Sequence, residues 1–186
     1  MLIILSIILL VVIIIPVLWF VFAYNGIIRL QNQVNAAWSD INVQLKRRHN
    51  LIPNLIESVK GYKEYEGDIL KSVVALRQNA IKANSIEEKA AAESALGLGL
   101  GKIFAVAEHY PELKANEGFL DLQKNLSELE EYIQNARRYY NGTVRDYNTK
   151  IQSIPNNIIA SFCKFNSREF FALDSDAEKE VPKVAF

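Results

Sequence analysis

No charged side chain precedes Arg29, and this absence constrains the chain more than any other feature. Residues 2–23 read LIILSIILLVVIIIPVLWFVFA, an apolar run interrupted by Ser6 and Pro16. A helix rises 1.5 Å per residue, so this run would extend about 33 Å and could cross a hydrocarbon layer about 30 Å thick. Such a helix satisfies its own backbone and tolerates a proline in lipid. We therefore predict a transmembrane anchor over residues 1–23 that contacts the lipid bilayer through residues 2–23.

A cleaved signal peptide is the main alternative to an anchor, because Val21-Phe22-Ala23 could serve as a cleavage site. However, the amino end carries no Lys or Arg, and the run exceeds the roughly 7–15 apolar residues of a signal peptide. Basic side chains follow the run at Arg29 and at 46–48, and the positive-inside rule assigns that side to the cytoplasm. We expect an uncleaved, single-pass membrane protein with a cytoplasmic C-terminal part.

The remainder of the chain has the composition of a soluble domain. Its charges cancel, with 21 basic and 21 acidic side chains and a formal net charge of zero. Proteins that bind nucleic acid usually show a basic surplus, so we expect no nucleic-acid partner. The single cysteine, Cys163, cannot form an internal disulfide and belongs to no zinc-ligand pattern.

Apolar residues recur in steps of three and four through most of this remainder, which indicates amphipathic helices. The first helix is either kinked or broken at Asn50–Pro53, because proline removes a backbone hydrogen bond. Ser85 and Glu88 match a capping box, which marks a helix start. Alternation with period two, the pattern of strands, is missing from the sequence. The predicted helices cover residues 24 to about 62, 68–83, the segment from the capping box to Pro111, and 117–153.

A helix with one apolar stripe must bury that stripe against other helices, and short connections favour antiparallel neighbours. The predicted fold class is therefore all-α: an N-terminal transmembrane helix followed by an antiparallel four-helix bundle with long first and last helices. We assign residues 24–171 to this bundle and residues 172–186 to an extended C-terminal tail.

A phenylalanine-rich segment follows Pro155, and Asn156 is expected to cap a short helix there. We predict a flap packed on the end of the bundle, with a second membrane-contacting element as the alternative. The large apolar side chains of this segment are Ile158, Ile159, Phe162, Phe165, Phe170 and Phe171.

Gly97-Leu98-Gly99-Leu100-Gly101-Lys102 superficially suggests a phosphate-binding loop. The spacing is wrong, because Leu96 stands where the motif needs glycine and Ile103 replaces its Ser or Thr. We interpret these glycines as positions in a helix that allow a neighbour to approach closely or cause a local bend.

Other candidate side chains also fit structural roles better than chemical ones. His49 and His109 lack zinc-ligand spacing, and Cys163 has no base beside it in the sequence. The segment Arg137–Tyr147 mixes cations with aromatics, but Tyr140 and Tyr147 fall on the predicted core stripe. The basic run 46–48 could contact anionic lipid, although a projecting helix would hold it about 35 Å from the bilayer. We expect no catalytic, cofactor-binding or metal-binding residue.

Several motifs in this order resemble the LemA family. They include Ala37-Trp38-Ser39, Val43-Gln44-Leu45-Lys46-Arg47-Arg48, Leu51-Ile52-Pro53-Asn54-Leu55, Tyr110-Pro111-Glu112-Leu113-Lys114-Ala115, Ala136-Arg137-Arg138, Tyr147-Asn148 and Pro182-Lys183-Val184. The family often has aspartate where this chain has Asn42 and Asn50, which weakens any idea of an essential carboxylate there.

The resemblance implies a bacterial inner-membrane protein with one N-terminal membrane helix, an antiparallel four-helix bundle and no assigned catalytic residue. Genes of the family often neighbour those of a membrane zinc metalloprotease, which implies a membrane-protein partner. We expect a scaffold or interaction protein without enzymatic activity, in which a homo-oligomer is compatible with the helical surfaces. The alternatives are an accessory enzyme with a site near His109 and Cys163, a regulator associated with a membrane protease, or an oligomeric membrane-perturbing protein.

Overall fold

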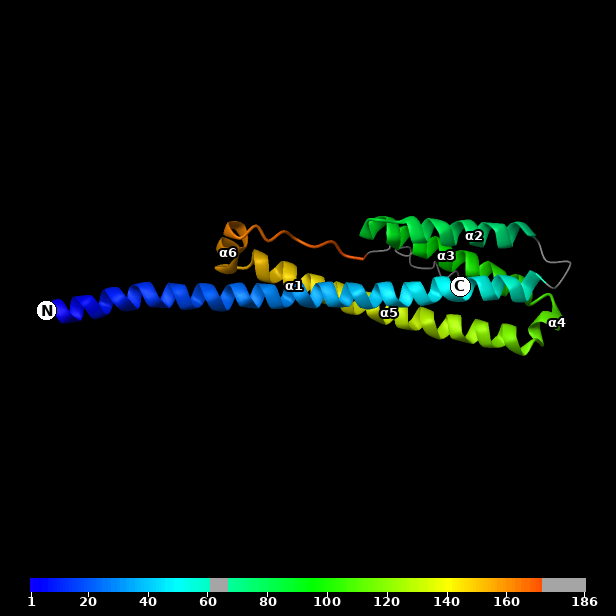
Figure 1. The fold of residues 1–186 in the computed structure, drawn as a ribbon, viewed down its shortest axis with the longest axis horizontal. Coiled ribbons are helices and arrows are strands. Elements are labelled where there is room, and N and C mark those ends of the chain that lie inside the picture. The colour runs from blue at the N-terminus through cyan, green and yellow to red at the C-terminus, as the bar shows by residue number, and fades with distance from the viewer. Residues whose placement is uncertain (61–66, 172–186) are drawn as a thin grey trace, which may run out of the picture. The chain divides into compact units, whose positions relative to one another are not determined.

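The computed structural model describes residues 1–60 and 67–171, and within these ranges every regular element is a helix (Figure 1). The prediction of an all-α chain with an apolar N-terminal helix is confirmed. The predicted tail at 172–186 and the expected end of the first helix near residue 62 lie outside the described ranges. The helices are α1 (Leu2–Lys60), α2 (Gly67–Lys82), α3 (Ile86–Ala107), α4 (Pro111–Lys114), α5 (Glu117–Gln152) and α6 (Asn156–Phe162).

Helix α1 continues through both Pro16 and Pro53, so the alternative of a break at Asn50–Pro53 is wrong. Its large apolar side chains from Ile3 to Phe22 are between 37 and 76% exposed, and its most apolar window is not buried at all. Helix α3 is also long and apolar enough to span a membrane, but its apolar side lies in a protein core. The membrane-length segment whose apolar side chains the protein leaves exposed is therefore the first part of α1.

The chain forms two compact units, and α1 and α5 contribute to both. Taking the described residues only, we call Met1–Ile41 with Ala136–Glu169 the anchor unit, and Asn42–Asn135 with Phe170 and Phe171 the core unit.

In the anchor unit, α1 and α5 run antiparallel. Residues later in α1 contact residues earlier in α5, as two contacts show. The rings of Trp38 and Tyr140 have centroids 5.3 Å apart, whereas Gly26 lies beside Lys150, whose Cε would be 3.8 Å from a Cβ added to the glycine. The buried side chains of this unit are Ala23, Ile27, Val34, Ala37, Ile41, Tyr140, Val144, Tyr147, Ile151, Ile159 and Ala160.

Helix α6 differs from the prediction at its start and in its packing. Pro155 holds the N-cap position and Asn156 is the first helical residue, so the expected Asn156 cap is wrong. The expected flap is packed only in part, because Ile159 is buried while Ile158 and Phe162 are exposed. This asymmetry arises because a helix presents opposite faces to the protein and to its surroundings.

The turn after α6 reverses the chain at Lys164, whose φ is 57°. The Phe165 N–H donates to the Ala160 carbonyl oxygen (2.9 Å) and the Lys164 N–H to that of Ser161 (3.3 Å), which is the pattern of a Schellman motif. A left-handed conformation is costly for a side chain such as lysine, at roughly 1–2 kcal/mol. The turn is nevertheless retained, and it brings the Phe165 ring to 5.7 Å from that of Tyr24 in α1.

Residues 166–169, which we call the strap, return along α5 and are held by their backbone. The Tyr147 hydroxyl donates to the Asn166 carbonyl oxygen at 3.1 Å, and the Tyr140 hydroxyl donates to that of Glu169 at 2.9 Å. Asn148 exchanges two hydrogen bonds with the backbone of Arg168, both of 2.9 Å. Three side chains of α5 therefore fix the strap in place.

The core unit contains one hydrophobic cluster to which α1, α2, α3, α4 and α5 all contribute. The predicted capping box is confirmed, with the Glu88 N–H donating to Ser85 Oγ at 3.0 Å. Gly99 allows the close approach expected of the glycines in α3, because a Cβ there would lie 2.8 Å from Leu76 Cδ1 of α2. The cluster is formed by Ile52, Leu55, Ile56, Val59, Leu70, Val73, Ala80, Leu96, Leu100, Ile103, Ala107, Leu113, Phe119 and Leu126.

Helix α3 is shorter than predicted. It ends at Ala107 instead of continuing to Pro111, and Pro111 begins the separate four-residue helix α4. Proline suits the first position of a helix, since its missing N–H would have no intrahelical partner there.

The buried tyrosines predict a specific loss of stability at alkaline pH. Burial raises the pKa of Tyr140 and Tyr147 above the ordinary value of 10.0; the nearby Arg168 charge lowers both by less, and the Glu169 carboxylate adds a small further rise at Tyr140. Because the folded-state pKa values are raised, the stabilisation is complete below pH 10 and is lost as the pH rises through them. We expect the free energy of unfolding to fall above pH 10, and this fall to be weaker in the Tyr140→Phe, Tyr147→Phe double variant.

Urea unfolding of the full chain in detergent at several pH values, with tyrosinate absorbance as the second readout, measures this loss. The exposed Tyr139→Phe substitution is the matched control and should leave the pH dependence unchanged. Identical pH profiles for the double variant and the unsubstituted protein would contradict the assignment.

Candidate functional site

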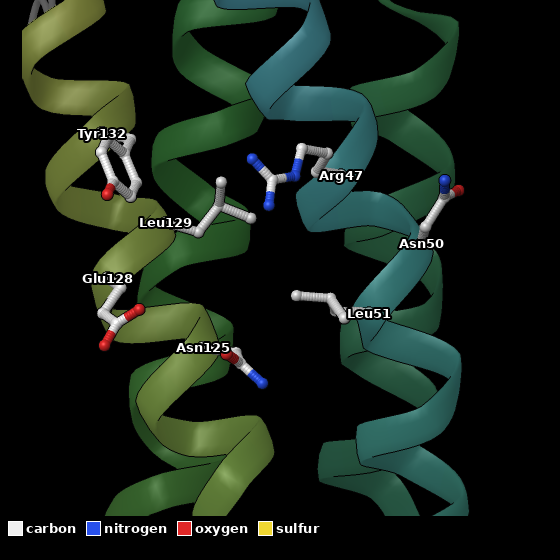
Figure 2. Close-up of a pocket in the computed structure, with 7 residues that line it drawn as sticks. All are labelled: Arg47, Asn50, Leu51, Asn125, Glu128, Leu129 and Tyr132. Carbon is white, nitrogen blue, oxygen red and sulfur yellow. The ribbon is translucent and has the colours of Figure 1, made fainter.

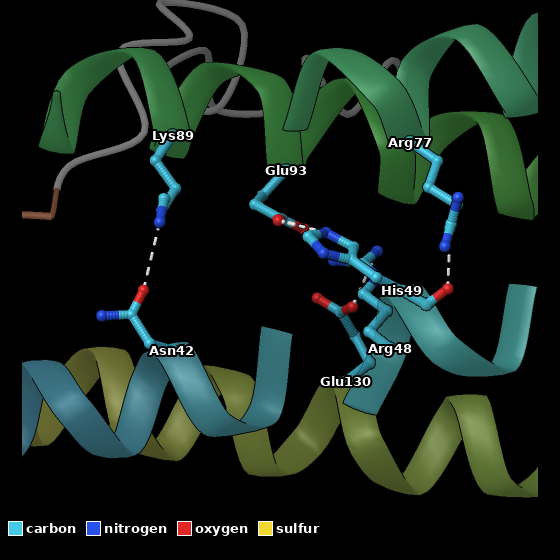
Figure 3. A network of polar contacts seen from close by, with 7 residues as sticks. All are labelled: Asn42, Arg48, His49, Arg77, Lys89, Glu93 and Glu130. Atoms are coloured by element: carbon cyan, nitrogen blue, oxygen red, sulfur yellow. Dashed lines mark hydrogen bonds and ion pairs between the residues drawn. The ribbon is translucent and has the colours of Figure 1, made fainter. Parts of the chain in front are cut away.

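A buried arginine lies in the core unit on the inner face of α1. Arg48 is 4% exposed and occupies the position between Leu45 and Ile52 on the buried stripe. An unpaired charge is very costly to bury, so the guanidinium must be neutralised by nearby carboxylates. The surrounding helices supply them (Figure 3).

Two carboxylates on different helices bind the Arg48 guanidinium. Its Nη2 lies 3.1 Å from Glu130 Oε2 on α5, and its Nη1 lies 3.5 Å from Glu93 Oε2 on α3. The other oxygen of Glu93 lies 2.7 Å from His49 Nε2, so one carboxylate bridges two consecutive residues of α1. Glu93 is as buried as Arg48, whereas the Glu130 side chain is 43% exposed. We call Arg48, His49, Glu93 and Glu130 the polar cluster.

Gly97 provides the space that the Arg48 guanidinium needs. It lies one helical turn beyond Glu93 in α3, and a Cβ on it would be only 2.9 Å from Arg48 Nη2. The glycines that resemble a phosphate loop therefore have structural roles: Gly97 accommodates a buried side chain and Gly99 accommodates α2.

Pro53 also contributes to the polar contacts, through the hydrogen bond that it cannot make. In an α-helix the N–H of residue 53 would bind the carbonyl oxygen of residue 49, and proline has no N–H. The Arg77 side chain of α2 supplies the missing donor, with its Nε 2.8 Å from the His49 carbonyl oxygen. The proline thus leaves a backbone acceptor on α1 that α2 binds, so the His49 carbonyl oxygen has a hydrogen-bond partner although the helical bond from residue 53 is missing.

Asn42 makes a further contact between α1 and α3. Its Oδ1 accepts a hydrogen bond of 3.1 Å from Lys89 Nζ. The amide therefore interacts with a lysine at a position where the resemblance stated above leads us to expect aspartate. A carboxylate is not needed for that contact, since an amide oxygen also accepts from an ammonium group.

An open groove of about 370 Å³ lies between α1 and α5 on the same unit (Figure 2). Leu51 and Leu129 form its apolar part, and the side chains of Arg47 and Asn125 point into it from opposite helices. Tyr132 lies at the edge and is exposed. Asn50 and Glu128 complete the lining.

The residues singled out in the sequence do not converge on a reactive site. His109 is exposed in the core unit, whereas Cys163 is half-buried in the anchor unit. Tyr140 and Tyr147 are buried, as the stripe predicts, while Arg138 is exposed on the neighbouring face. Among the described residues, no group of three His, Cys, Asp or Glu side chains could hold a metal ion.

The sequence interpretation missed the polar cluster, although a signal was present. The basic run 46–48 divides in the structure: Lys46 and Arg47 are exposed and Arg48 is buried. Arg48 falls three residues after Leu45 and four before Ile52, which are helix-face spacings. Glu93 likewise takes a buried position, three residues before the buried Leu96, while its neighbour Ala92 is half-buried.

The described residues form a helical protein with an exposed, membrane-length apolar N-terminus. The comparisons assign the family: the chain belongs to the LemA family, whose pattern matches residues 37–186. It is 30% identical over 141 residues to Protein LemA of Metamycoplasma hominis, covering 73% of this chain and 63% of that protein.

Other relatives carry a different name. The chain is 25% identical over 174 residues to Magnetosome protein MamQ 2 of Paramagnetospirillum magneticum, and 23% identical to Magnetosome protein MamQ of Magnetospirillum gryphiswaldense. Both matches cover 80% of this chain and 64% of the relative. The chain thus spans less than two thirds of the length of these curated relatives. Family and helical architecture together are consistent with a membrane-associated, single-pass helical protein.

The polar cluster predicts that the loss of Glu93 lowers the free energy of unfolding more than the loss of Glu130. Glu93→Gln leaves Arg48 and His49 buried without their shared anion, and we expect a loss of about 3–5 kcal/mol in the free energy of unfolding. Glu130→Gln is the matched control, because that carboxylate is half-exposed and should contribute less than about 1 kcal/mol. Urea unfolding of the full chain in detergent compares the two variants. Equal losses would contradict the assignment of Glu93 as the main counter-ion.

The contact between Pro53 and Arg77 predicts coupling between the two residues. Arg77→Met removes the donor to the His49 carbonyl and should cost about 1–3 kcal/mol. In a Pro53→Ala background the restored N–H binds that carbonyl, so the same Arg77→Met change should cost less, by about 1 kcal/mol. A double-mutant cycle measures this difference from urea midpoints. A cost of Arg77→Met that is the same in both backgrounds would rule out the exchange of donors.

Proposed function

We propose that this protein is a non-enzymatic scaffold, anchored by α1 in the inner membrane of a bacterium, that holds a membrane-protein partner. The observation that carries the proposal is the continuity of α1. One uninterrupted helix supplies the bare apolar segment at 3–22 and also buries Ile27 in the anchor unit and Ile52 in the core unit. The bilayer segment and both folded units therefore share one helix.

An antiparallel four-helix bundle is part of this proposal. Support comes from the hydrophobic cluster of the core unit, which draws on α1, α2, α3 and α5, and from the antiparallel course of α1 and α5 in the anchor unit. A bundle of this kind offers long helical faces for binding.

The groove between α1 and α5 is the surface that we assign to the partner. It combines two leucines with Arg47 and the exposed Tyr132, and arginine and tyrosine are enriched where protein interfaces gain most of their energy. A membrane metalloprotease is the partner that the family resemblance favours. A second copy of the chain would use the same kind of surface, whereas the balanced charge offers nothing to a nucleic acid.

The cytoplasmic placement of the larger part rests on Arg29 and the basic residues beyond it. A cysteine introduced at the C-terminal end, in a Cys163→Ser chain, reports the side of the membrane by its reaction with an impermeant reagent in intact cells. Labelling only after lysis is expected. Labelling of intact cells would reverse the topology and with it the compartment of the partner.

Photo-cross-linking in intact cells tests the scaffold. A photoreactive residue at Tyr132, in the groove, should give an adduct with a membrane protein, and Arg47→Glu should greatly reduce its yield. The same residue at the exposed Gln78 of α2 is the control and should give no adduct. Only unlinked chain at both positions would remove support for the scaffold, and an adduct of the chain with itself would replace the proposed partner by a homo-oligomer.

Absence of enzymatic activity is tested separately. The accessory-enzyme alternative relies on His109 and Cys163, which belong to different units. A His109→Ala, Cys163→Ser double variant should complement a deletion strain fully. Failure to complement, in a variant that folds and reaches the membrane, would favour the enzyme.

A further inference from the structure

The boundary between bare and covered helix in α1 is sharp. Phe22 is 75% exposed and Ala23 is 8% exposed, and from there on α1 buries one face in the anchor unit. The apolar run of the sequence ends at the same residue. If α1 spans a membrane, the interface between lipid and water must therefore lie close to residues 22–24.

Helix α6 lies beside this boundary. The Phe165 ring, three residues after the end of α6, packs 5.7 Å from the ring of Tyr24, and Figure 1 shows α6 alongside α1 at that level. The Schellman turn at Lys164 directs Phe165 to this contact. The position of α6 along α1 is thus fixed by contacts within the anchor unit.

The outer side of α6 is apolar and uncovered. Ile158 and Phe162 are four residues apart and so share one helix face, and they are 65 and 80% exposed. Ile154, just before the helix, is 84% exposed. Isolated exposed apolar residues are common, but three large ones that adjoin a bare lipid-length helix indicate an interaction surface. We call Ile154, Ile158 and Phe162 the α6 patch.

The chain segment that contains the α6 patch carries charges of a single sign, and Asp146 and Glu169 flank it. Between Tyr147 and Arg168 the chain carries Lys150, Lys164 and Arg168 and no acidic residue. Lys150 lies against Gly26 of α1, only a few residues beyond the apolar run. Cations next to an apolar surface at this level match anionic lipid headgroups, which attract each nearby Lys or Arg by about 1 kcal/mol.

We propose that the α6 patch inserts into the interfacial layer of the membrane that α1 spans, with a preference for anionic lipid. The proposal rests on the anchoring of α1 in a membrane and adds a second, separate lipid contact. We assign lipid to the α6 patch because the patch adjoins the exposed apolar surface of α1. It does so at the level where that surface would leave the hydrocarbon layer. Two contacts, one spanning and one interfacial, restrict the rotation of α1 about its axis, which a single helix leaves free.

Spin-label accessibility in proteoliposomes tests the proposal with the full chain. A nitroxide is attached to Phe162→Cys in a Cys163→Ser chain, and its relaxation is measured with oxygen, which concentrates in lipid, and with a water-soluble nickel chelate. The control is Tyr139→Cys, an exposed position of α5 in the same unit, about 20 Å along the helix from its end at Gln152. We expect a several-fold higher oxygen-to-nickel ratio at position 162 than at 139.

Two further variants keep the result interpretable. Ile158→Cys repeats the measurement at a second exposed site and should agree with position 162. Serine at Ile154 and Ile158, both exposed, should lower the ratio at position 162 without loss of helix content. Vesicles of phosphatidylcholine with phosphatidylglycerol should give a higher ratio than phosphatidylcholine alone.

A label at Leu10→Cys separates this proposal from the anchoring on which it rests. High oxygen access at position 10, together with nickel access at 158 and 162 equal to that at 139, overturns the α6 contact and leaves the anchor intact. Nickel access at position 10 overturns the anchor itself. Dipolar broadening between labels at position 162, without oxygen access, overturns the lipid contact in favour of a second copy of the chain.

Discussion

The arrangement of the core unit depends on the ion pairs of the buried Arg48 guanidinium with Glu93 and Glu130. A cation buried on the inner face of α1 must be neutralised, and the carboxylates that do so come from α3 and α5. The hydrophobic cluster favours burial of apolar surface but does not select one register of the helices. The charge does, because a one-turn slip of α3 would displace Glu93 from its place beside Arg48 Nη1.

Pro53 and Arg77 add a contact between helices that involves the backbone of α1. The carbonyl of His49 is unpaired within α1 because of a residue four positions later, and α2 supplies its donor. His49 therefore joins two helices to α1: its ring contacts Glu93 of α3 and its carbonyl accepts from α2. A proline that would weaken an isolated helix here creates an attachment point.

The helices could be predicted from the sequence, and the polar contacts could not. Stripes of period 3.6 located α1, α2 and α5 closely, because burial of one helix face requires that spacing. Helix α4 was missed, since four residues carry no periodicity. The pairing of Arg48 with Glu93 joins residues 45 positions apart, and no local pattern encodes such a partner. The exposure of Ile158 and Phe162 could not be predicted either. An apolar residue in a sequence predicts burial, but it does not show what covers the side chain.

The strap has a consequence for how this part of the chain can vary. Tyr140, Tyr147 and Asn148 all bind backbone atoms of residues 166–169, and none of these bonds uses a strap side chain. The attachment is therefore indifferent to which side chains the strap displays. Its outward residues can change to suit a different lipid or a different neighbour, while the three side chains of α5 keep the path of the chain the same.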